Sequence, residues 1–253
     1  MPQSPTLDDL LQQQPLWRAG RPPLGKQRRE QTLDSGWPAL NRALHYGGWP
    51  RCGSCELLHD AVGIGELSLL LPALAALSRD SSIAWVAPPF LPYAPGLVQQ
   101  QLLLAQQFVL QAPPAQQLWC TEEALRSGAF TAVLSWSNGD LSHRQLRRLH
   151  LAAQDGRCWH VHFRPGCCAQ QASPAPLRLH LSGQNSALQL QVLKQPGGHG
   201  GQTLSVARPE ALLHRQRPAQ QWPVYLPPRG RLTLHPKNTR STGSLISPAR
   251  ARA

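Results

Sequence analysis

The sequence predicts an α/β fold in which a mainly parallel sheet is flanked by helices and carries antiparallel strands at one edge. Strand and helix patterns alternate from about residue 54 to residue 163, which is typical of a parallel sheet covered by helices. The run Ile83–Ala87 is apolar throughout, as expected of a strand buried on both faces. From residue 177 onward strand patterns follow one another without helices, which favours an antiparallel extension.

The first elements of this pattern are a short helix, a strand and a second helix. Leu40 and Leu44 share one face of the short helix, and the glycine pair at 47–48 ends it, because glycine permits the left-handed conformation that terminates helices. Residues 54–58 form a short strand candidate. Residues 67–77 are rich in Leu and Ala and are predicted to be helical.

The middle of the chain continues the alternation. Residues 96–107 are predicted to be a helix, residues 117–120 a short strand, and residues 122–127 a helix that Gly128 closes. Residues 130–136 form the clearest strand, because apolar and β-branched side chains dominate the run.

The last elements are one long helix and the strands that follow it. Residues 141–154 form the clearest helix, with Asp140 as a candidate N-cap and Gly156 just past the end. Period-two alternation marks the later strands. The strands expected after this helix are 158–163, 177–181, 188–194 and 203–206.

The net charge of +12 is distributed unevenly along the chain. Residues 208–253 hold nine Lys or Arg against one Asp or Glu, whereas residues 1–31 and 32–207 each have an excess of two. We therefore divide the chain into an N-terminal segment with a polar linker, a folded domain over 32–207, and a basic, Pro-rich tail that is predicted to be disordered. Such a tail can attract nucleic acid nonspecifically or serve only for solubility.

Two termini carry apolar residues that suggest docking. The N-terminal segment holds a short amphipathic stretch made of Leu7, Leu10, Leu11, Leu16 and Trp17, which can pack on the domain or on a partner. The tail holds the apolar island Gln221–Leu226, and such islands often fold onto a partner or onto their own domain. The candidate partner- or DNA-binding residues of the tail are Trp222, Tyr225, Arg229 and Arg231.

The chain is expected to be cytoplasmic. It has no signal-peptide pattern, and no apolar run approaches the ~20 residues that span a bilayer. The six cysteines are then expected to be reduced. Cys52 and Cys55 have a metal-like spacing, but a zinc site needs a second spaced pair, so no metal is predicted. His160 and His162 alternate on a strand, where a structural role is the expectation.

A glycine-containing loop lies between the strand at 54–58 and the helix that follows it. This layout is that of a phosphate-binding loop, where backbone amides and a helix N-terminus hold the anion. A working loop ends in Gly-Lys-Ser/Thr, but here Gly65 is followed by Glu66 and Leu67. A carboxylate ~4 Å from a phosphate is repelled by roughly 4 kcal/mol at an effective dielectric near 20. Alternatively, Gly63 and Gly65 only make a tight turn.

A second requirement of nucleotide chemistry is also missing. The strand 130–136 should end in an Asp that holds magnesium, but it ends in Ser135 and Trp136. We therefore predict no cofactor and no ATPase activity at the degenerate loop. A residual ATPase that uses an unconventional pocket is the alternative.

Several motifs together resemble the ImuA family over roughly residues 32–207. They are Tyr46–Arg51, Glu56–Leu58, Gly63–Leu67, Leu69–Leu74, Ala87–Pro89, Pro92–Pro95, Glu123–Gly128, Leu146–Leu149, Phe163–Pro165 and Ser173–Leu179. This resemblance implies a RecA-like core, which RecA and the cell-division inhibitor SulA share. It also implies an accessory role in SOS-induced translesion synthesis and mutagenesis, with ImuB and a C-family error-prone polymerase as partners and RecA as a further candidate. The rival interpretation is a SulA-type inhibitor of FtsZ.

The long helix carries three arginines that are candidates for binding a partner or DNA. Arg144, Arg147 and Arg148 are spaced three and four apart, so the guanidinium groups are neighbours on one helix face, where they repel one another and are expected to lack acidic neighbours. This arrangement favours an anionic partner, and a solvated helix face is the alternative.

Overall fold

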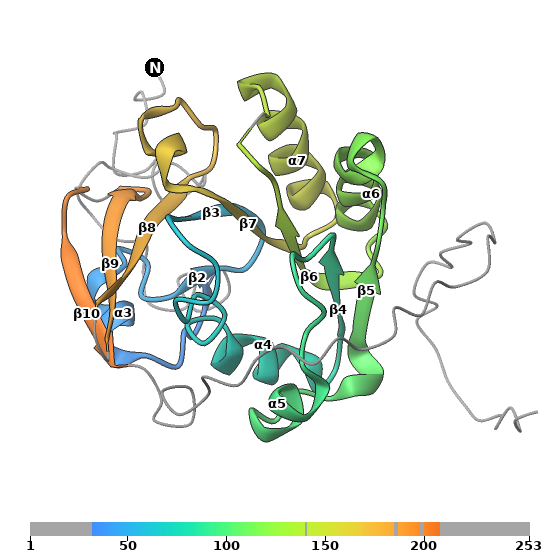
Figure 1. Ribbon diagram of the computed structural model, residues 1–253, viewed down its shortest axis with the longest axis horizontal. Helices are drawn as coiled ribbons and strands as arrows, with labels where there is room; N and C mark the ends of the chain where they lie inside the picture. Colours follow the sequence, from blue (N-terminus) through green and yellow to red (C-terminus); the bar gives the residue numbers. More distant parts are fainter. Residues whose placement is uncertain (1–31, 140, 185–186, 198–199, 208–253) are drawn as a thin grey trace, which may run out of the picture.

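The fold is built on an eight-stranded sheet with the strand order β10-β9-β8-β3-β7-β6-β4-β5 (Figure 1). The computed structural model describes residues 32–139, 141–184, 187–197 and 200–207. The predicted disorder of the tail and the candidate residues Trp222, Tyr225, Arg229 and Arg231 therefore lie outside the described residues. The sheet confirms the predicted α/β class with a mostly parallel sheet.

Six neighbouring strands of the sheet are parallel, and two antiparallel strands complete one edge. The parallel strands are β3 (Gly53–His59), β4 (Ser82–Val86), β5 (Gln107–Leu110), β6 (Phe130–Trp136), β7 (Trp159–Pro165) and β8 (Leu177–Gln184). Strands β9 (Ala187–Lys194) and β10 (Thr203–Ala207) then continue from β8 as antiparallel neighbours. A separate ribbon pairs β1 (Thr32–Leu33) with β2 (Trp49–Pro50). The predicted antiparallel extension is thus confirmed.

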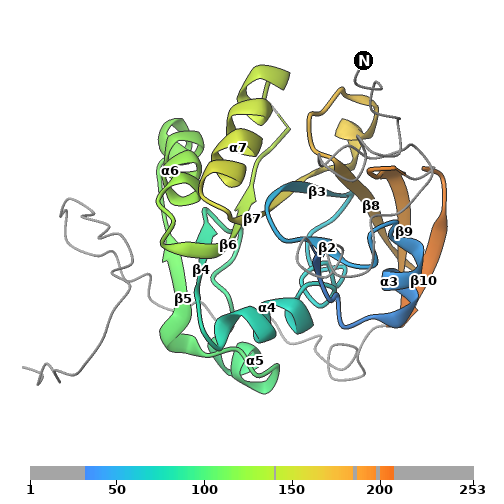
Figure 2. The same ribbon diagram turned by 180° about the vertical axis from the view of Figure 1, so that it is seen from behind.

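Helices cover both faces of the sheet (Figure 2). One face is covered by α3 (Pro38–Ala43), α4 (Leu71–Ser78) and α5 (Ala94–Gln99), and the other by α6 (Pro114–Arg126) and α7 (His143–Asp155). Two short 3-10 turns, η1 (Leu104–Gln106) and η2 (Gly166–Gln170), join strands. Each face has its own apolar cluster, and Trp49, Trp85 and Trp159 are fully buried on the α4 side.

The N-cap of helix α7 lies two residues after the candidate N-cap Asp140. The N-cap is Ser142, whose hydroxyl accepts from the backbone N–H of Gln145 while the Gln145 side chain accepts from the backbone N–H of Ser142. This reciprocal capping box satisfies two donors that a helix N-terminus leaves open. Gly156 follows the helix as predicted.

Two predicted elements are wrong. Residues 117–120 lie inside α6 rather than in a strand, because Pro114 occupies the first turn, where its missing N–H is tolerated, and the helix runs on to Arg126. The helix predicted over 96–107 ends at Gln99, and β5 begins at Gln107. Strand β5 forms because it pairs with the buried strand β4, a tertiary contact that a four-residue pattern does not reveal.

Candidate functional site

The degenerate loop lies where open α/β sheets bind their ligands. It follows β3 at the carboxyl end of that strand, and β7 and β6 separate β3 from the next strand in sequence, β4. Ligands of such sheets bind beyond the carboxyl ends of the strands, where the strand order reverses. The loop, the segment after β4 and the end of β6 therefore surround one site.

Glu66 folds back onto its own loop. Its two carboxylate oxygens accept hydrogen bonds from the backbone N–H groups of Gly63, at 3.0 Å, and of Gly65, at 3.1 Å. The loop can point these amides inward because both glycines adopt positive φ angles, 84° and 102°, which favour glycine. Glu66 is 4% exposed. Charge-assisted bonds to backbone amides are stronger than neutral ones, so the two donors already hold an anion.

Apolar and aromatic groups fill the positions where a nucleotide site has its metal and its hydroxyl. Leu67 packs against the core. Trp136, at the end of β6, stacks on Phe163 with ring centroids 4.7 Å apart and on Trp85 at 6.3 Å. Indole and phenyl rings offer no oxygen to Mg²⁺, which takes oxygen ligands. Among the described residues, no group of three or more His, Cys, Asp or Glu is placed to hold a metal ion.

An apolar cavity of about 160 Å³ opens directly over the loop. Its walls include Glu66, Trp85, Trp136 and the Pro-rich segment after β4. That segment presents Phe90 with 71% of its surface exposed, and the neighbouring exposed apolar side chains are Val62, Leu91 and Tyr93. Val62 and Phe90 line the same cavity, and exposed apolar side chains that gather at one place mark interaction sites. The site is therefore suited to an apolar protein surface.

A buried chain of serine and histidine side chains crosses the middle of the sheet on the α7 face. His160 hydrogen-bonds Ser54 and Ser135, both at 2.8 Å, and His162 hydrogen-bonds Ser135 at 2.7 Å and Ser137 at 3.0 Å. Burial lowers the pKa of both imidazoles, that of His160 well below its ordinary value and that of His162 to about 4. Both histidines therefore act as neutral structural groups at neutral pH.

Next to this chain, Glu56 lies between two arginines. Its carboxylate is 3.3 Å from Arg164 and 2.8 Å from Arg178, and it accepts a hydrogen bond from Ser173. Burial alone raises the pKa of Glu56, but the Ser173 hydroxyl and the two guanidinium groups outweigh that effect and hold the pKa below its ordinary value. Arg164 is fully buried, so this carboxylate neutralises charge inside the domain.

The arginines of α7 do not contribute to the loop site, because α7 packs on the opposite face of the sheet from α4, the helix that follows the loop. Arg148 forms an ion pair with Glu122 of α6, and Arg126 pairs with the same carboxylate at 3.0 Å. The expectation that Arg148 has no acidic neighbour is therefore wrong, since Glu122 is distant in sequence. Arg144 and Arg147 are exposed, and the proposal that they bind a partner stays a prediction.

Sequence reasoning identified Gly63, Gly65, Glu66 and Leu67 but missed two parts of this region. The repeated prolines around Phe90 could have indicated the exposed apolar segment, because proline lacks the backbone N–H that helices and sheets use. Glu56 also has a signal, because it is a lone acid inside an otherwise apolar strand. A buried charge of that kind requires partners.

The fold and this loop define the chain as an α/β protein whose phosphate-type loop is closed by its own carboxylate. Residues 55–160 match the family model described as cell division inhibitor SulA. The chain therefore contains a SulA-like domain. None of the helices among the described residues has the length and hydrophobicity needed to cross a membrane.

Solved structures that match the chain include the crystal structure of SulA from Pseudomonas aeruginosa. It is 31% identical over 44% of this chain and 98% of that chain, with a TM-score of 0.38, which is too low to inform the geometry. No curated protein matches the chain.

Proposed function

We propose that the chain is a nonhydrolysing accessory protein of SOS-induced translesion synthesis that works by binding partners. The observation that supports this proposal most is the hydrogen bonding of the Glu66 carboxylate to Gly63 and Gly65. A triphosphate has to displace this carboxylate, and it then meets a negative charge instead of a lysine. Repulsion of roughly 4 kcal/mol at ~4 Å corresponds to about three decades in affinity.

Replacing Glu66 by alanine is expected to raise the affinity of the loop for triphosphate by at least about tenfold, because it frees two amide donors and removes a like charge. Isothermal titration calorimetry with MgATP measures this change, and the unaltered protein is expected to give no binding heat. Glu123→Ala on the exposed side of α6 is the matched control. Tight MgATP binding by the unaltered protein contradicts the proposal.

The apolar surface over the closed loop supports a protein partner. Phe90 is exposed, and the cavity beside it is lined by rings and prolines, which are features of interface anchors. The resemblance to the ImuA family supplies the identity of the partners, namely ImuB and through it a C-family polymerase. The strands β8 to β10 lie beyond the SulA-like segment 55–160, so the folded domain extends past the part that matches the SulA family.

Phe90→Ala is expected to weaken binding to ImuB by tenfold or more without changing stability, because aromatic anchors contribute most of the energy of an interface. Co-purification and titration of the full-length protein with ImuB measure the loss. Trp119→Ala removes another exposed aromatic side chain, from α6, and serves as the control. Failure of the full-length protein to bind ImuB at all would remove the translesion role.

A SulA-type inhibitor of cell division is the second candidate. The match of residues 55–160 to the SulA family model favours it. Sedimentation of FtsZ polymers in the presence of the full-length protein tests it, and a stoichiometric decrease in polymer would support division inhibition over the accessory role. The same Phe90→Ala and Trp119→Ala proteins then show whether the apolar surface is used.

A further inference from the structure

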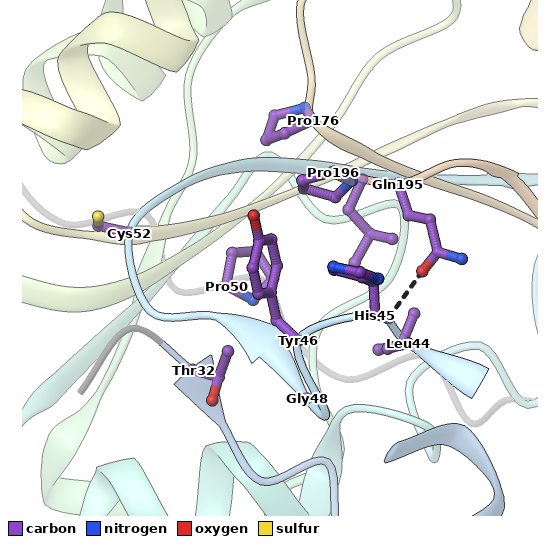
Figure 3. A pocket seen from close by; sticks show the side chains of 11 residues that line it. Thr32, Leu44, His45, Tyr46, Gly48, Pro50, Cys52, Pro176, Gln195 and Pro196 are labelled. Carbon is purple, nitrogen blue, oxygen red and sulfur yellow. Dashed lines mark hydrogen bonds between the residues drawn. The ribbon is translucent and has the colours of Figure 1, made fainter. Parts of the chain in front are cut away.

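Figure 3 shows the residues that line a second and larger apolar pocket, of about 300 Å³. The pocket lies at the opposite end of the sheet from the degenerate loop. It opens at the amino ends of β3 and β8. Most of its lining is apolar and comes from Leu44, Tyr46, Pro50, Pro176, Leu177 and Pro196. A hydrogen bond of 2.9 Å from the backbone N–H of His45 to the Gln195 side chain holds one wall in place. A volume of this size accepts a large side chain.

The N-terminal segment joins the domain at the rim of this pocket. Thr32 lines the pocket, and its position is fixed because β1 pairs with β2, Thr32 opposite Pro50. Gly48, just before β2, approaches β1 so closely that a Cβ there would lie 2.1 Å from the carbonyl oxygen of Leu33. The N-terminal segment therefore joins the domain at a defined position beside the pocket.

The C-terminal tail is the poorer occupant because it leaves the sheet at the end opposite to the pocket. Strand β10 ends at Ala207, which pairs with Ala187 at the start of β9. Gln195, which lines the pocket, follows the opposite end of β9. The tail thus begins at the end of the sheet that carries the degenerate loop, whereas the N-terminal segment joins the domain at the end that carries the pocket.

The N-terminal segment also has the chemistry that the pocket requires. Leu7, Leu10 and Leu11 are spaced three and four apart, and Leu16 and Trp17 follow them. This spacing is typical of one apolar helix face. Residues 18–31 separate Trp17 from Thr32, and the entropy cost of closing a flexible loop of this kind rises only slowly with its length. The occupant can therefore reach back to the pocket without strain.

We propose that the apolar stretch 7–17 of the same chain docks in this pocket, with Trp17 as its anchor. The native thiol of Cys52, which is exposed and lines the pocket, provides a probe. Cys167 is also exposed but lies on η2, after the carboxyl end of β7, so it serves as a control within the same molecule.

The experiment compares maleimide labelling of the full-length protein with that of Leu16→Ser/Trp17→Ser, followed by peptide mass spectrometry. We expect Cys52 to react at least tenfold faster in the double variant and Cys167 to react equally in both. Leu151→Ser, which replaces an exposed leucine on α7, should leave both rates unchanged. Equal labelling of Cys52 in the unaltered protein and the double variant overturns the proposal.

A cross-link tests whether docking occurs within one chain. The variant Arg18→Cys keeps Leu16 and Trp17. Treated with a short bismaleimide, it is expected to join residue 18 to Cys52 in the monomer at all protein concentrations. A product that joins two chains and grows with concentration assigns the pocket to a second copy and overturns the proposal as stated.

Discussion

Replacing Glu56 by glutamine is expected to lower the free energy of unfolding by about 3–5 kcal/mol, because it leaves buried arginine charge without its counter-ion. Glutamine keeps the shape of the side chain, so the change isolates the charge. The Arg164 side chain is 0% exposed and that of Arg178 is 7% exposed, and neither guanidinium can move into water without disturbing the sheet. Urea unfolding at neutral pH measures the loss.

Glu122→Gln provides the control, because Glu122 also bridges two arginines. There the arginine side chains are 51% and 55% exposed, and ion pairs with solvent-exposed partners contribute below about 1 kcal/mol. Equal losses in the two variants would contradict the view that burial makes the Glu56 cluster important. A double variant, Glu56→Gln with Arg164→Met, should recover part of the loss, since it removes the charge left unpaired.

The sequence predicted the elements whose signal is local. The strand at 83–87 is apolar along its whole length, apolar side chains dominate the strand at 130–136, and the hairpin strands after residue 177 alternate with period two. Neighbours along the chain therefore suffice to identify them. The strand predicted at 117–120 failed because Leu118, Trp119 and Cys120 fit a helix equally well when a proline pair precedes them.

The site was predictable in composition but not in geometry. The replacement of lysine by Glu66 is visible in the sequence, and it correctly indicated a negative charge in the loop. The sequence does not show that this side chain accepts from its own loop, because that depends on the φ angles of Gly63 and Gly65. The sequence also does not reveal the partners of Glu56, because Arg164 and Arg178 lie 108 and 122 residues away along the chain.

Acidification from pH 7 to pH 5 is expected to destabilise the protein by about 4 kcal/mol through His160 and His162. Both are fully buried, and desolvation lowers the pKa of His162 to about 4 and that of His160 well below 6.5. The unfolded chain takes up these protons near pH 6.5 whereas the folded chain does not. Stability is therefore complete above pH 6.5 and falls as the pH drops towards the folded pKa, by about 1.4 kcal/mol per pH unit for each histidine.

Charged and titratable groups near the two imidazoles also influence the stability between pH 5 and pH 7, or at lower pH. His150 and Arg164 oppose protonation, whereas Glu56 favours it only at His162. Glu56 itself contributes to the pH dependence only below its ordinary value of 4.5. Urea unfolding across pH 5–7 of His160→Asn/His162→Asn, which keeps polar groups next to Ser54 and Ser135, should show a slope reduced to that of the remaining histidines. An unchanged slope would mean that other groups take up the protons and that the buried serine–histidine chain is tolerant of charge.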